Sequence, residues 1–189
     1  IRFWNLMIRS QIITENEIKN ESIWVMDLSS SELILITISK TNKIMKWQWH
    51  PEENVYKLEK DQLWEFPADQ INIVKIIDEN RMVTGDSSRN LILWDMDKKS
   101  VISQLKHSKR HTKLINSIVL TKSYMISCGG ELKLWDRKNF TFTSSLETEN
   151  NEQPKLIQGL SNNMDIFYYL TRNNTIHKYD LAAQKVSYI

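Results

Sequence analysis

Residues Asn90–Asp95 read NLILWD, an alternating apolar run that ends in an aromatic residue and a carboxylate. The same form recurs in five segments of the chain. Their aromatic residues are Trp4 in IRFWNL, Trp47 in IMKWQW, Trp94 in LILWDM, Trp135 in LKLWDR and Tyr179 in IHKYDL. Successive aromatic residues lie 43, 47, 41 and 44 residues apart. Self-similarity at a nearly fixed period indicates stacked copies of one structural unit, so the sequence predicts a repeat protein.

Each unit reads as four strands. Two strand-like runs, rich in β-branched and aromatic residues, precede each aromatic residue. They are Ile23–Leu28 and Leu33–Ser39, Ile71–Ile77 and Met82–Gly85, Ile115–Leu120 and Met125–Cys128, and Leu156–Leu160 and Ile166–Thr171. The aromatic residue then lies on the third strand, and a polar turn and a fourth strand follow it. A period in the forties with four strands is typical of a β-propeller blade. The predicted fold class is all-β.

Several segments resemble the WD-repeat (WD40) family. NLILWD and ELKLWD are similar to the Trp-Asp ending that names the family, and VTGDSSRNLILWD (83–95) resembles its second strand, turn and third strand in order. RHTKLINSIVL (110–120) resembles the Gly-His opening of a blade, with Arg110 in place of the glycine. The resemblance covers essentially all 189 residues. It implies a propeller that holds other proteins.

The repeats divide the chain into about four and a half blades. Residues 1–18 read as the third and fourth strands of a half blade, and complete blades are expected over 22–66, 71–107, 114–148 and 155–189. A closed propeller ring leaves no free sheet face at its two ends, so it does not offer a surface for pairing with other chains. We therefore expect a partial WD-repeat propeller, part of a larger ring that is completed by additional blades from the same or another chain.

The departures from the family pattern concern hydrogen bonds. The family's structural tetrad joins a His before the first strand, a Ser or Thr on the second strand, an Asp six residues before the Trp, and the Trp itself. That Asp position holds Thr41, Ser88, Gly129 and Asn173. Only the repeat of Trp135 has the histidine, His111, with Ser127 and Trp135 to complete a partial set. The resemblance thus implies blades held by apolar packing, with the hydrogen bonds of the tetrad lost.

Charge and cysteine content narrow the classes of function. The chain has 25 Lys and Arg against 23 Asp and Glu, a net charge of +2, which gives no argument for nucleic acid. No apolar run approaches the roughly 18 residues that a membrane helix needs. The single cysteine, Cys128, has no partner for an internal disulfide. We expect an intracellular, cytoplasmic protein, with a cytoskeletal or ciliary setting as one candidate.

The sequence offers no candidate catalytic or metal site. The four histidines His50, His107, His111 and His177 fall in different units and lack the spacing of metal ligands. No Gly-x-Ser-x-Gly elbow accompanies them, and His111 has a structural role in the repeat. A reactive thiol at Cys128 would need a basic neighbour in space. We expect no enzymatic activity and no cofactor.

Basic residues of the predicted loops are the candidate partner-binding residues. In the family, the turn after the second strand and the loop before the first strand share one face. The basic residues in these positions are Lys40, Lys43, Arg89, Lys109, Arg110 and Arg172. Trp49 and Trp64, on outer parts of the first complete blade, are candidate aromatic anchors. The expected partners are other proteins, including acidic or phosphorylated segments.

Three functions remain open at this level. The first is a non-catalytic protein–protein interaction scaffold within a larger assembly. The second is recognition of an anion by the basic face, with a phosphopeptide, a phosphoinositide or RNA as ligand. The third is the accessory domain of an enzyme. Strong weakening by salt would favour the second over the first, because anion binding releases counterions.

Overall fold

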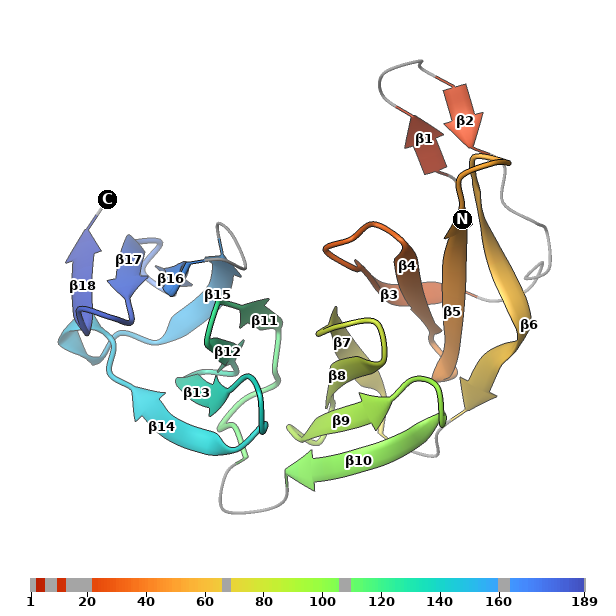
Figure 1. Ribbon diagram of the computed structural model, residues 1–189. Helices are drawn as coiled ribbons and strands as arrows, with labels where there is room; N and C mark the ends of the chain where they lie inside the picture. Colours follow the sequence, from red (N-terminus) through yellow and green to blue (C-terminus); the bar gives the residue numbers. More distant parts are fainter. Residues whose placement is uncertain are drawn as a thin grey trace.

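The computed structural model describes residues 3–5, 10–12, 22–65, 69–105, 110–159 and 164–188, and for the strand residues 3–5, 10–12, 59–65, 105 and 188 it describes only the backbone. Antiparallel β-sheets follow one another along an open arc (Figure 1). Within these residues the single helical segment is the 3-10 turn η2 (Glu149–Asn151). The all-β fold with four-stranded sheets confirms the predicted fold class.

Five sheets make up the arc. A two-stranded sheet pairs β1 (Phe3–Asn5) with β2 (Ser10–Ile12). Blade 1 contains β3 (Ile23–Leu28), β4 (Ile34–Ser39), β5 (Lys43–His50) and β6 (Val55–Glu65). Blade 2 contains β7 (Ile71–Ile76), β8 (Arg81–Asp86), β9 (Leu91–Asp95) and β10 (Ser100–Leu105). Blade 3 contains β11 (Ser117–Leu120), β12 (Tyr124–Cys128), β13 (Leu132–Asp136) and β14 (Phe142–Leu146). Blade 4 contains β15 (Pro154–Gly159), β16 (Ile166–Thr171), β17 (Ile176–Asp180) and β18 (Lys185–Tyr188).

The third strand of each blade carries the repeating aromatic residue. Trp94 lies on β9 and packs in one cluster with Ile36 and Ile44 of blade 1. Trp135 lies on β13 and packs with Leu91 and Leu93 of blade 2. Tyr179 on β17 packs with Leu134 of blade 3 in the same way. Each of these aromatic residues therefore fills the interface with the preceding blade.

Three tryptophans also donate a hydrogen bond inside their own blade. The indole Nε1 of Trp47 donates to the hydroxyl of Thr37 at 2.9 Å, and that of Trp94 donates to Thr84 at 2.8 Å. Trp135 Nε1 donates to Ser127 Oγ at 2.8 Å. The expectation that the hydrogen bonds of the tetrad are lost is therefore wrong for the link between tryptophan and hydroxyl in blades 1 and 2, whereas the partial set expected in the repeat of Trp135 is present. A buried N–H without an acceptor is costly, and the hydroxyl on the second strand removes that cost.

Blade 3 extends this link to a histidine. The buried His111 places Nε2 2.7 Å from Ser127 Oγ, which completes a chain from His111 through Ser127 to Trp135. Gly129 makes the approach of the imidazole possible. A Cβ atom at this position would lie 2.7 Å from Cγ of His111, closer than real contacts allow. The glycine therefore belongs to the structural set of this blade.

Candidate interaction surfaces

The turns after the second strands lie beside the segments that lead into the next blade. Asn42 Nδ2 donates to the carbonyl of Asp69, and Arg89 Nη1 donates to the carbonyl of Thr112. Lys113 Nζ then donates to Gln153 Oε1 at 2.6 Å, which links blade 3 to the entry of blade 4. We call this edge of the arc the upper rim. The candidate residues on it are Lys40, Lys43, Arg89, Arg110 and Arg172, while Lys109 lies outside the described residues.

Two of these arginines are engaged by neighbouring segments. Arg110 is half-buried, and its Nε donates to Asn90 Oδ1 at 2.8 Å. Arg89 donates to Thr112, as above, from an exposed turn where its backbone φ is +67°. Lys40 lies over the ring of Trp24, with its Nζ 5.5 Å from the ring centroid. Arg172 has an exposed side chain and makes its described bond, to Gln153, through its backbone.

Carboxylates share the upper rim with these cations. Glu131 pairs with the buried amine of Lys133 at 3.2 Å, and Lys133 also donates to the carbonyl of Arg110. Asp69 accepts a hydrogen bond from Ser88. Glu152 accepts one from Thr175 at 2.8 Å. The rim therefore carries both signs of charge: Glu131 belongs to the turn after the second strand of blade 3, and Asp69 and Glu152 belong to the segments that lead into blades 2 and 4.

Sequence reasoning missed a buried polar cluster in blade 4. His177 Nε2 lies 2.9 Å from the hydroxyl of Thr175, and its Nδ1 lies 3.6 Å from Glu149 Oε2. The imidazole also stacks on Tyr169, with ring centroids 4.8 Å apart. A hydroxyl, an imidazole and a carboxylate in a row have the composition of a catalytic triad. Since His177 is fully buried, however, no substrate reaches it in this conformation, and the cluster holds the turn before β17.

Other reactive groups are also withdrawn from solvent. Cys128 is buried, and burial raises the pKa of its thiol to about 11, so it is protonated and unreactive at neutral pH. Among the described residues, no group of three or more His, Cys, Asp or Glu side chains is placed to hold a metal ion. The same part of the chain contains no helix long and apolar enough to cross a bilayer.

The two candidate aromatic anchors differ in what the structure describes. Trp49 is half-buried and tilts against Tyr56, with ring centroids 4.9 Å apart, beside the apolar cluster of Trp47. It serves packing within blade 1. Trp64 lies on β6, and its side chain lies outside the described residues. Trp24 on β3 is the exposed tryptophan of the described part, with 48% of its surface accessible.

The outer face of blade 4 is open and carries one apolar row, beside a row formed by Gln158, Tyr168 and Lys178. The register pairs Leu156 with Leu170 and Leu170 with Ile176, so these three residues form one row across β15, β16 and β17. Leu156 is 46% exposed and Ile176 is 49% exposed. The residues of β16 alternate between half-buried and buried, whereas all six residues of β4 are buried. The second strand of blade 4 is therefore covered on one face, and that of blade 1 on both.

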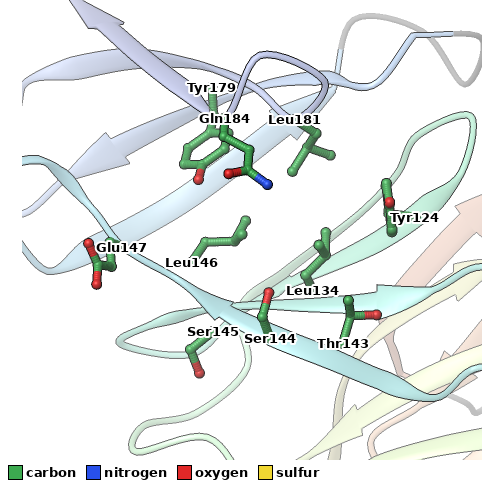
Figure 2. Close-up of a pocket in the computed structure, with 10 residues that line it drawn as sticks. All are labelled: Tyr124, Leu134, Thr143, Ser144, Ser145, Leu146, Glu147, Tyr179, Leu181 and Gln184. Atoms are coloured by element: carbon green, nitrogen blue, oxygen red, sulfur yellow. The ribbon is translucent and has the colours of Figure 1, made fainter.

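A groove of about 440 Å³ runs between blades 3 and 4 (Figure 2). One wall is β14, and the other comes from the end of β17 and the turn after it. The lining residues are Tyr124, Leu134, Thr143, Ser144, Ser145, Leu146, Glu147, Tyr179, Leu181 and Gln184. Aliphatic side chains line the interior, and hydroxyl, amide and carboxylate groups surround it.

Comparison with known proteins shows the fold and little beyond it. No protein-family model and no curated protein matches the sequence. A solved structure titled U3-55K has a TM-score of 0.68 at 12% identity, and covers 89% of this chain and 51% of its own. The crystal structure of the RRP9 WD40 repeats has a TM-score of 0.69 at 12% identity, with coverages of 90% and 51%. The computationally designed protein Ika4 has a TM-score of 0.66 at 15% identity, with coverages of 95% and 99%.

These comparisons establish that the sheets are WD40-type propeller blades. The chain spans about half the length of the first two structures. The fold predicted from the spacing of the aromatic residues is confirmed.

Proposed function

We propose that the chain is an intracellular, non-catalytic scaffold for protein–protein interaction within a larger assembly, and that further blades continue its propeller. The open apolar row Leu156, Leu170 and Ile176 on blade 4 is the observation that carries this proposal. WD40-type blades fit a scaffold by fold, and the specific role comes from surfaces. The intracellular setting is supported by the single, buried and unpaired cysteine Cys128.

The open face has an equivalent that is buried elsewhere in the same chain. In blade 1 the register pairs Val25 with Ile38 and Ile38 with Ile44, the same pattern as the row on blade 4. Ile38 and Ile44 are fully buried because they pack in one cluster with residues of blade 2. The row on blade 4 is also aliphatic, but no described blade packs against it. Fully burying one Leu or Ile side chain contributes about 1.5–3 kcal/mol, so a partner sheet gains appreciably from this face.

Ile176→Glu tests the open face directly. We expect the chain of residues 1–189 to associate as its concentration rises, because exposed apolar sheet faces pack together. The charge in the variant opposes that packing, so we expect its sedimentation velocity profile to move towards the monomer. Its melting temperature should stay within a few degrees of the wild type.

Ile102→Glu is the matched control. Ile102 lies on the outer strand β10 and is also 49% exposed, but it belongs to a different surface. The control should associate as the wild type does. A wild-type chain that stays monomeric at all concentrations, or equal behaviour of the two variants, contradicts the proposal.

Anion recognition at the upper rim is the second candidate function, and the exposed side chains of Arg89 and Arg172 support it. A guanidinium group binds phosphate or carboxylate through two parallel hydrogen bonds. We expect Arg89→Glu with Arg172→Glu to weaken binding of a fluorescent phosphoserine peptide by several-fold, without changing the melting temperature. Added salt should weaken the wild-type complex as well.

Arg110→Glu is less informative in this assay, because the Nε of Arg110 also donates a hydrogen bond to Asn90 Oδ1. Lys138→Glu, an exposed cation in the turn after β13, is the control for net charge. If the double charge reversal leaves the peptide affinity unchanged, the upper rim does not bind anions and the second candidate function is wrong.

A further inference from the structure

The groove between blades 3 and 4 lies beside a free sheet edge. β14 is the last strand of its sheet, in the order β11-β12-β13-β14, and its outer edge pairs with no described strand. Figure 2 shows the aliphatic side chain of Leu146 pointing from β14 into the space below Tyr179 and Leu181. A strand laid along this edge would therefore have the groove directly beside it.

The edge of β14 lacks the usual protection against pairing. Phe142–Leu146 reads FTSSL, without a charged residue or a proline. The outermost strand of blade 1, β6, instead carries Lys57, Glu59, Lys60 and Asp61. Charges and prolines on edge strands prevent pairing with other chains. Unpaired N–H and C=O groups on an uncharged edge are the groups that an added strand satisfies.

The interior of the groove fits an aliphatic side chain. Leu134 is buried in the same cluster as Tyr179, and Leu146 and Leu181 are half-buried against it. Ser144 and Gln184 lie at the opening (Figure 2). An apolar interior with a polar opening anchors one side chain and leaves its backbone in contact with water and with the edge.

A carboxylate at one end of the groove determines the charge of the ligand. Glu147 follows β14, is exposed, and makes no hydrogen bond or ion pair with the described part of the chain. Glu147 lines the groove together with Tyr179. Burial, and then the charge of Glu147, raise the pKa of the Tyr179 hydroxyl. A cation at this end would be the complementary group.

We infer that an extended segment of a partner protein binds here as a fifth strand of blade 3. The segment pairs with the free edge of β14, places one aliphatic side chain between Leu146 and Leu181, and places a lysine or arginine at Glu147. This inference rests on the proposed scaffold function and names the chemistry of one partner. It concerns the face of blade 4 that meets blade 3, whereas the Ile176 row lies on the opposite face.

A labelled peptide tests the inference on the full chain. The probe is a six-residue peptide that alternates leucine and threonine and ends in lysine, and the comparison peptide ends in glutamate. Fluorescence anisotropy should show the lysine peptide binding at least threefold more tightly. A lysine peptide with N-methylated backbone amides should not bind, because it cannot donate to the edge of β14.

Glu147→Lys should reverse the preference between the two peptides. Glu79→Lys makes the same change of charge at an exposed site outside the groove and should leave the preference intact. Both variants should melt as the wild type does, since neither carboxylate has an ion pair among the described residues.

No saturable binding, or binding that is indifferent to both Glu147→Lys and N-methylation, overturns the inference. Loss of self-association in Glu147→Lys without any peptide binding overturns it as well, and assigns the groove to a second copy of the chain. If peptide binding fails while Ile176→Glu still abolishes self-association, the groove is rejected and the scaffold proposal stands.

Discussion

Trp135→Ala is expected to lower the free energy of unfolding by about 3–5 kcal/mol, the range for a large aromatic side chain removed from a core. Trp135 is 1% exposed and lies in the cluster that joins blades 2 and 3. Its ring also meets Phe142 edge-on, with centroids 5.2 Å apart. The substitution leaves a cavity and removes the donor to Ser127, so two costs add. Urea denaturation followed by fluorescence and circular dichroism measures the loss.

Trp24→Ala is the control for removal of an indole as such. Trp24 is half exposed, and it packs in none of the apolar clusters of the described residues. We expect this variant to lose less than about 1 kcal/mol, as surface substitutions do. A loss below about 1 kcal/mol at Trp135 would mean that the third strand of blade 3 has another register.

The spacing of the aromatic residues was sufficient to predict the blades. Trp47, Trp94, Trp135 and Tyr179 lie on β5, β9, β13 and β17, the third strands of their sheets. A buried ring must meet the same neighbours in every blade, so it stays at one position while polar residues drift. Because side chains alternate between faces, a shift of one residue would turn each ring to the other face of its sheet, away from the preceding blade, which is why the register survives.

The hydrogen bonds of the blades were harder to predict because they cross the sheet. Thr37 and Thr84 each lie ten residues before their tryptophan, whereas Ser127 lies eight residues before Trp135. The shorter interval arises from a tighter hairpin: the last strand pair is Cys128 with Leu132 in blade 3, but Ile38 with Ile44 and Gly85 with Leu91 in blades 1 and 2. The sequence analysis named Ser127 but tested the other blades only at the Asp position, six residues before the tryptophan, and so missed Thr37 and Thr84. The recurring threonine at ten residues was the available signal.

The surfaces were predictable only as far as they depend on strand order. Strand order alone brings Arg89 and Arg172 to the upper rim. The acidic residues beside them come from turns and entry segments that the folded sheet brings together, as with Asp69 and Ser88, which lie 19 residues apart and both belong to blade 2. The groove depends on how far β14 lies from the turn after β17. No local sequence pattern predicts the distance between these two segments, because they belong to different blades.

Acidification is expected to destabilise the protein through His111. Burial, and then the charge of Lys133, lower the pKa of His111 from 6.5 to about 3 in the folded chain. Below pH 6.5 the imidazole of His111 is protonated in the unfolded state but stays neutral in the folded state. Stability therefore falls as the pH is lowered, by about 1.4 kcal/mol for each pH unit between about pH 6 and 3. Urea denaturation at a series of pH values measures this slope.

His111→Gln isolates the contribution, because the slopes of variant and wild type are compared rather than their absolute stabilities. The window from pH 6 to 4.5 is the most informative. Hydrogen bonds from Thr175, Thr171 and Asn173 lower the pKa of Glu152 from 4.5, so its stabilising effect is lost only below that pH. We expect the variant to have the flatter profile in this window. Equal slopes would show that Glu131, whose Oε1 lies 4.0 Å from His111 Nδ1, holds a proton on the folded imidazole after all.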